Sequence, residues 1–194
     1  MRETVRSAVA AIAPIDVLAG EHIRDALTWI DSGADLFRVE RPATPSPHLV
    51  SYFVPIDTTR RTLLLEEHLR SGLWLPPGGH VEVDEDPRDA VRRECLEELG
   101  VEARFLAAGP LLVTITDTTR EVHTDVSLWY AIALSQDEPM RIDTREMASV
   151  RWFSFAEATG LDPMTTDPHL ARFVSAIDGL LAVTEESAFL RTNG

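Results

Sequence analysis

The stretch that decides the fold is Trp74–Val101, with the sequence WLPPGGHVEVDEDPRDAVRRECLEELGV. Its first part contains Pro76-Pro77-Gly78-Gly79, which interrupts regular structure and lets the backbone approach a ligand or ion closely. Asp86 followed by Pro87 is typical of a helix start, and Gly100 is the residue type that ends a helix. The segment therefore predicts a tight loop followed by a helix over 87–99.

Three glutamates share one side of this predicted helix. Its i, i+4, i+8 apolar stripe, which faces the core, is formed by Val91, Cys95 and Leu99. Beside the stripe lie Glu94, Glu98 and, one step further round, Glu97. Like charges at this spacing repel, so a divalent cation is a simple reason to keep them, and oxygen ligands favour Mg²⁺ or Mn²⁺ over Zn²⁺. The alternative is a solvated acidic face paired with Arg92 and Arg93.

The spacing of the residues from Gly79 to Val101 decides between the cation site and the solvated acidic face. The fixed positions are Gly79, Glu85, Arg93-Glu94, an apolar Cys95, Glu97-Glu98, Gly100 and an apolar Val101. Together they resemble the signature of the Nudix hydrolase family, with no position departing from it. The resemblance covers about residues 50–183. It implies an α/β Nudix fold, in which a mixed β-sheet is sandwiched between helices, and hydrolysis of a nucleoside diphosphate linked to another group.

The resemblance also assigns roles to the residues that match the motif. Glu94, Glu97 and Glu98 are expected to ligate Mg²⁺ or Mn²⁺, with the carbonyl of Gly79 as a further ligand. Arg93 would orient the carboxylates, because its guanidinium is a fixed fork of donors. The remaining box glutamate, Glu85, would anchor the loop.

A general base is needed as well, and two candidates remain open. One is Glu94. The other is Glu146, which lies six residues before Trp152, where many members of the family place a glutamate ahead of the last strand.

Weaker signals concern the substrate, which is expected to be a small nucleotide-like diphosphate, for example a nucleoside triphosphate cleaved by a pyrophosphatase. Candidates for contact with phosphate are Arg60, Arg61 and Arg70. Trp74 is a candidate wall for a base. His80, His123 and Asp125 are candidates for contact with substrate or metal.

The rest of the chain divides into three parts. Residues 1–47 form an N-terminal helical extension, with a helix at 20–32, and end in a proline-rich linker at 41–47. The resemblance implies that residues 48–185 form a Nudix domain, and 186–194 are expected to be a C-terminal tail. In the domain, strands are expected at 49–56, 62–66, 111–116, 126–134 and 150–153, and further helices at 155–160 and 168–182. The apolar stripe of the N-terminal helix must be buried against the main domain or a second copy, so a homodimer through this helix is one expectation.

The composition and net charge of the chain limit the kinds of partner that it can bind. The 194 residues carry 18 Arg, no Lys and 32 acidic residues, giving a net charge of −14. Nine acidic residues and three Arg between Glu82 and Glu102 contribute −6 of it. This acidity argues against nucleic acid polymers and anionic membranes. One cysteine and no long apolar run predict a cytoplasmic protein.

Two alternatives remain from the sequence. One is an isopentenyl diphosphate isomerase-like enzyme, which shares the fold but needs a catalytic cysteine and additional metal ligands beyond a degenerate box, whereas this box is intact. The other is a non-catalytic Nudix-type ligand-binding or regulatory module. Loss of box glutamates is common in such modules, whereas all are present here.

Overall fold

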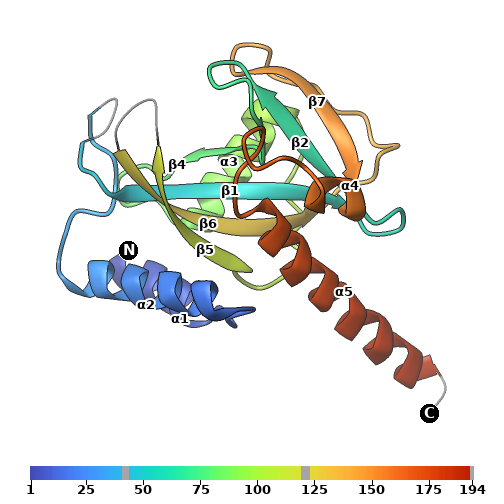
Figure 1. The fold of residues 1–194 in the computed structure, drawn as a ribbon, viewed down its shortest axis with the longest axis horizontal. Coiled ribbons are helices and arrows are strands. Elements are labelled where there is room, and N and C mark those ends of the chain that lie inside the picture. Colours follow the sequence, from blue (N-terminus) through green and yellow to red (C-terminus); the bar gives the residue numbers. More distant parts are fainter. Residues whose placement is uncertain (41–43, 119–122, 193–194) are drawn as a thin grey trace.

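A mixed seven-stranded sheet forms the centre of the computed structural model, which describes residues 1–40, 44–118 and 123–192 (Figure 1). Its main path runs β3-β2-β1-β6-β5, with β4 paired to β1 and β7 paired to β2. The strands are β1 (His48–Asp57), β2 (Thr62–His68), β3 (Trp74–Leu75), β4 (Gly78–His80), β5 (Leu112–Thr118), β6 (His123–Ala133) and β7 (Met147–Ser154). The one parallel pairing of these strands, β1 with β6, places the two longest strands at the centre.

Alternation along β1 and β6 divides the core into two layers. Leu49 and Phe53 of β1 pack with α3 (Pro87–Leu99) on one face, which we call the α3 face. Val54 and Ile56 point to the other face and pack against α4 (Phe155–Thr159) and α5 (Leu170–Thr192), so we call it the α5 face. These helices on both faces confirm the expected α/β sandwich.

The N-terminal extension is two helices packed on the domain. α1 (Arg2–Ala10) and α2 (Val17–Asp31) lie together beneath β5 and β6 in Figure 1. Ala26 and Ile30 of α2, with Val5 and Val9 of α1, are buried in the same cluster as the α3 face of the sheet. The apolar stripe predicted for residues 20–32 is therefore covered within the chain, and a homodimer through it stays a prediction.

The predicted helix over 87–99 is confirmed. Asp86 caps its start, accepting a hydrogen bond of 2.8 Å from the backbone of Arg88, and Gly100 ends it with a left-handed φ of 67°. Other elements differ by a few residues from the predicted ranges, and α5 continues to Thr192 through residues assigned to a tail. α1 and the short strands β3 and β4 were not predicted. The linker predicted at 41–47 lies partly outside the described residues. No helix within the described ranges is long and apolar enough to cross a membrane.

Candidate active site

Four glutamates from three segments converge on the α3 face of the sheet. Glu94 and Glu98 come from α3, Glu66 comes from β2, and Glu146 precedes β7. After burial, which is the larger cause, the charges of Glu146 and Glu94 raise the pKa of Glu66, and the charges of Glu66, Glu94 and Glu146 raise the pKa of Glu98. We call these four residues the carboxylate cup.

The deepest member of the cup is Glu98, which is only 3% exposed. Burial, and then the charges of its neighbours, raise its pKa to about 10, although the backbone of Gly78 donates a hydrogen bond to it. Burial likewise raises the pKa of Glu66 to about 8. The Oε2 atoms of both residues are buried without a hydrogen-bond partner among the described residues. Two orphaned carboxylate oxygens at one place are the donor set that a hard divalent cation would satisfy.

Arg93 holds the entrance of the cup in place. Its Nε and Nη2 atoms donate to the two oxygens of Glu85, each at 2.9 Å, and its Nη1 donates to Oε1 of Glu94 at 2.6 Å. A further bond of 3.2 Å reaches the carbonyl of His80. Although burial favours the neutral acid, the hydrogen bonds from Arg93 lower the pKa of Glu85. One guanidinium therefore ties the loop to the helix, as a rigid planar fork can.

Gly79 lies directly against the carboxylate of Glu94. A Cβ at this position would be 2.1 Å from Oε1 of Glu94. The preceding Gly78, with φ of 147°, approaches β1 so closely that a Cβ would be 2.3 Å from the carbonyl oxygen of Ser51. These contacts explain why the Pro-Pro-Gly-Gly segment, expected to be irregular, forms the short strand β4: glycine alone permits this pairing.

The remaining motif glutamate, Glu97, lies at the outer edge. Its side chain is 61% exposed, and one of its oxygens is 4.0 Å from Nη1 of Arg93. The second base candidate, Glu146, is exposed as well, on the loop whose backbone accepts a hydrogen bond from Leu69. Thus the structure brings both base candidates, Glu94 and Glu146, to the same site.

The substrate candidates are more scattered. Arg60 is paired with Asp57 and Asp137, and Arg61 with Asp178 and Glu185. Both lie at the β1–β2 turn, and Glu66 is five residues beyond Arg61 along β2, about 17 Å away at 3.3 Å per residue.

Three other candidates have different surroundings. Trp74 is half-buried on β3 and packs edge-on against Phe153. Arg70 lies in the turn between β2 and β3, next to the cup strand. His80 points away from the cup, toward His48.

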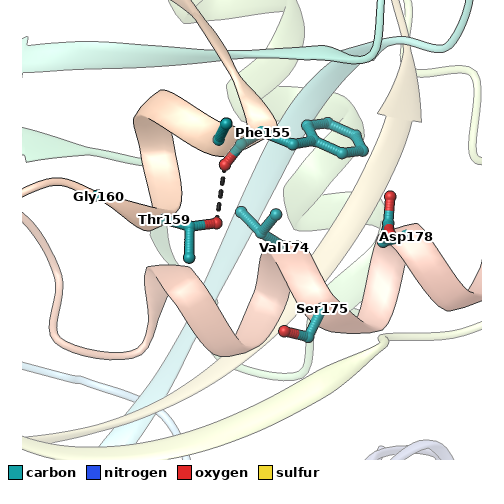
Figure 2. A pocket seen from close by; sticks show the side chains of 7 residues that line it. Phe155, Thr159, Gly160, Val174, Ser175 and Asp178 are labelled. Atoms are coloured by element: carbon teal, nitrogen blue, oxygen red, sulfur yellow. Dashed lines mark hydrogen bonds between the residues drawn. The ribbon is translucent and has the colours of Figure 1, made fainter.

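A separate hollow between α4 and α5 does not contribute to this site. Its wall includes Phe155, Thr159, Val174 and Asp178, and Thr159 Oγ1 donates to the carbonyl of Phe155 (Figure 2). Asp178 is already paired with Arg61, and none of the cup glutamates lines the hollow. The hollow is therefore separate from the carboxylate cup.

Glu66 is the member of the cup that sequence reasoning missed. It follows three leucines in a strand that was expected to end there. Alternation with Leu64, which faces α3, directs it into the cup. The sequence does show a glutamate two residues after a buried leucine, on the same face of the strand. Assigning Glu66 to the site, however, required knowing which face of the sheet α3 covers.

Comparisons with known proteins agree with this geometry. The family model described as NUDIX domain matches residues 47–176. The uncharacterized Nudix hydrolase YvcI of Bacillus subtilis is 27% identical over 128 residues, which is 65% of this chain and 78% of that protein. The asymmetrical bis(5'-nucleosyl)-tetraphosphatase of Rattus norvegicus is 29% identical over 106 residues, 54% of this chain and 71% of that protein. A solved structure of a NUDIX-family hydrolase from Clostridium perfringens superposes with a TM-score of 0.54 at 20% identity, covering 70% of this chain and 99% of that one.

Proposed function

The chain belongs to the Nudix hydrolase family, and from this premise we propose that it is a Mg²⁺- or Mn²⁺-dependent pyrophosphohydrolase whose carboxylate cup serves a nucleoside diphosphate linked to another group. A nucleoside triphosphate, cleaved to the monophosphate and pyrophosphate, is the first substrate to test. The observation that carries the proposal is the pair of orphaned, buried oxygens on Glu66 and Glu98 beside the intact motif.

The residues fit a hard cation. Glu94 and Glu98 present buried carboxylates to one space, Glu66 extends the set from the sheet, and the carbonyl of Gly79 adjoins Glu94. We infer that Glu97 completes the ligands at the exposed edge. When bound there, Mg²⁺ or Mn²⁺ supplies positive charge that neutralises a diphosphate and lowers the pKa of water. Without such a charge, an anionic substrate would be repelled by the cup.

The chain itself supplies position and proton transfer. Arg93 holds the carboxylate of Glu94 against Gly79 and fixes the loop through Glu85, so the ligand oxygens are ordered before substrate arrives. A carboxylate at the mouth of the cup removes a proton from the attacking water. Both Glu94 and Glu146 are candidates for this base.

These two candidates can be separated by substitution. If Glu146 is the base, Glu146→Gln lowers kcat by about 10²-fold or more and removes the acidic limb of the pH–rate profile. A loss of no more than about threefold would assign the role to Glu94 instead. Because Glu146 is exposed, the substitution leaves the packing of the cup intact.

The experiment that tests the function is a screen of nucleoside triphosphates, nucleotide sugars, dinucleoside polyphosphates and CoA with Mg²⁺ and Mn²⁺. We expect cation-dependent release of phosphate or pyrophosphate from at least one class. Glu97→Gln should lower that activity, whereas Glu102→Gln, in the same acidic segment but outside the motif, should not. Inactivity across the whole screen, or equal activity of Glu97→Gln and the wild type, would contradict the proposal.

Partners and location follow from the same premise. We expect small-molecule substrates and no nucleic acid polymer or membrane surface, since the net charge is −14. A cytoplasmic location stays a prediction.

A further inference from the structure

A second group of metal-ligand side chains lies on the opposite face of the sheet from the carboxylate cup. It consists of His48 on β1, His80 on β4, and His123 and Asp125 on β6. One ligand atom from each lies within 4.8 Å of one atom from every other. We call these four residues the histidine cluster.

Strand register explains how the cluster forms. His48 is the parallel partner of Asp125, and His80 is the antiparallel partner of Val50, two residues along the same strand from His48. Partners in register point to the same face, as do residues two apart, so all four side chains emerge on the α5 face. Gly79, one residue before His80, faces the cup instead. The two sites therefore share β4 but lie on its opposite sides.

The hydrogen bonds around the cluster fix which ring nitrogens carry protons. Nδ1 of His48 is 2.6 Å from the carbonyl oxygen of Pro45, which can only accept, so this nitrogen donates. The hydroxyl of Thr118 donates to the carbonyl of His123 at 3.1 Å, so Nδ1 of His123 must donate to that hydroxyl at 3.2 Å. With Nδ1 as the donor in both rings, Nε2 is the nitrogen left to ligate a metal. This arrangement is typical of metal-binding histidines, whose other nitrogen is held by a carbonyl or hydroxyl.

Both of these Nε2 atoms face one carboxylate oxygen. Oδ1 of Asp125 is 3.2 Å from Nε2 of His48 and 3.1 Å from Nε2 of His123. The edges of a tetrahedral Zn²⁺ site with bonds of about 2.0–2.1 Å measure about 3.4 Å. Within the described part of the chain, His48 Nε2, His80 Nε2 and Asp125 Oδ1 are buried without hydrogen-bond partners. A metal ion between these buried atoms would satisfy all three of them.

Charged groups from other elements also face the cluster. Arg38 acts on His80, whose ring centroid is 4.9 Å from that of His48. Asp167, in the segment before α5, is buried and acts on Asp125.

We propose that the histidine cluster is a Zn²⁺ site of the His₃Asp type, separate from the catalytic cation site. Three imidazoles and one carboxylate suit Zn²⁺ or Co²⁺ far better than Mg²⁺. Four protein ligands leave no open position, so the ion is structural. It joins β1, β4 and β6 at the edge where β4 carries Gly79 to the cup.

The test is Zn²⁺ binding by the full chain after removal of metals with a chelator. We expect one equivalent to bind with a Kd on the order of 10⁻⁶ M or tighter, and to raise the unfolding temperature. His123→Gln and Asp125→Asn should each weaken binding by about 100-fold or more. Two control variants should retain Zn²⁺ binding: His22→Gln, at a half-buried histidine outside the cluster, and Glu97→Gln, at the outer edge of the cup.

A measurement on the wild type keeps the test valid if cluster variants fail to fold. Co²⁺ in a tetrahedral site absorbs visible light strongly, whereas six-coordinate Co²⁺ in a carboxylate site absorbs weakly. We expect the intense spectrum at one equivalent of Co²⁺ and its loss when Zn²⁺ is added. Weaker Zn²⁺ binding than stated, a weak Co²⁺ spectrum, or loss of Zn²⁺ binding in Glu97→Gln would overturn the proposal. None of these outcomes bears on the proposed function, because Mg²⁺-dependent hydrolysis at the cup is measured separately.

Discussion

Gly79→Ala tests the geometry of the carboxylate cup most sharply. The new Cβ would lie 2.1 Å from Oε1 and 2.6 Å from Cδ of Glu94, where ordinary contact begins at 3.4 Å. The carboxylate must therefore move by about 1.3 Å, the difference between 3.4 and 2.1 Å. That movement also breaks the 2.6 Å hydrogen bond from Arg93. Since a displacement of about 1 Å at a catalytic group costs about 10²-fold in rate, we expect kcat/KM to fall by about that factor, or ~2.7 kcal/mol.

The assay is pyrophosphate or phosphate release at saturating Mg²⁺, with thermal unfolding measured on the same samples. The clash is with the end of a flexible side chain, so the unfolding temperature should change little. Gly109→Ala is the matched control, because no heavy atom lies within 4 Å of a Cβ there, and it should keep full activity. If Gly79→Ala remains within about threefold of the wild type, the placement of Glu94 against this glycine is not what catalysis depends on.

Three further predictions follow from the same contacts. The metal-free protein should lose stability as pH rises from about 5 to 9, because burial raises the folded-state pKa of Glu66 to about 8 and of Glu98 to about 10. Over this range the unfolded chain releases protons that the folded protein retains, so each added pH unit favours unfolding. Urea titrations at several pH values should show this loss, and added Mn²⁺ should reverse it. Arg93→Lys should lower kcat by about 10²-fold in steady-state assays, since an ammonium group cannot replace the fork that holds Glu85 and Glu94 together, and retention of activity would contradict this role. Cys95→Ala should keep activity within about threefold while lowering the unfolding free energy by about 1 kcal/mol, because this thiol packs in the core. Burial raises the pKa of the thiol to about 12, so it is not a ready nucleophile. A large loss of activity would support the isomerase alternative instead.

The local signals were sufficient for α3 and its ends. Asp86, Pro87 and Gly100 act through side chains and backbone angles within a few residues, so their effect is visible in the sequence. The position of Glu98 beside the apolar stripe that contains Cys95 also followed from helical periodicity, whereas its burial is seen only in the structure. These are the parts of the site that depend on one element alone.

Contacts between distant segments could not be predicted in this way. β4 forms because two glycines lie against β1, an approach that depends on the partner strand as much as on the loop. Glu66 reaches the cup only because β2 turns that face toward α3. The sequence marked His80, His123 and Asp125 one by one, but the register of β1 with β6 and β4 is what brings them to His48.

The central claim, that buried carboxylates of the cup hold a divalent cation for hydrolysis, is tested most directly by the Mg²⁺ dependence of phosphate or pyrophosphate release in the wild type and in Glu98→Gln. For the wild type we predict no turnover in excess chelator and full restoration by Mg²⁺ or Mn²⁺. For Glu98→Gln we predict a kcat lower by about 10²-fold or more and a half-saturating Mg²⁺ concentration at least about tenfold higher. Equal turnover with and without chelator, or an unchanged Mg²⁺ dependence in Glu98→Gln, would contradict it.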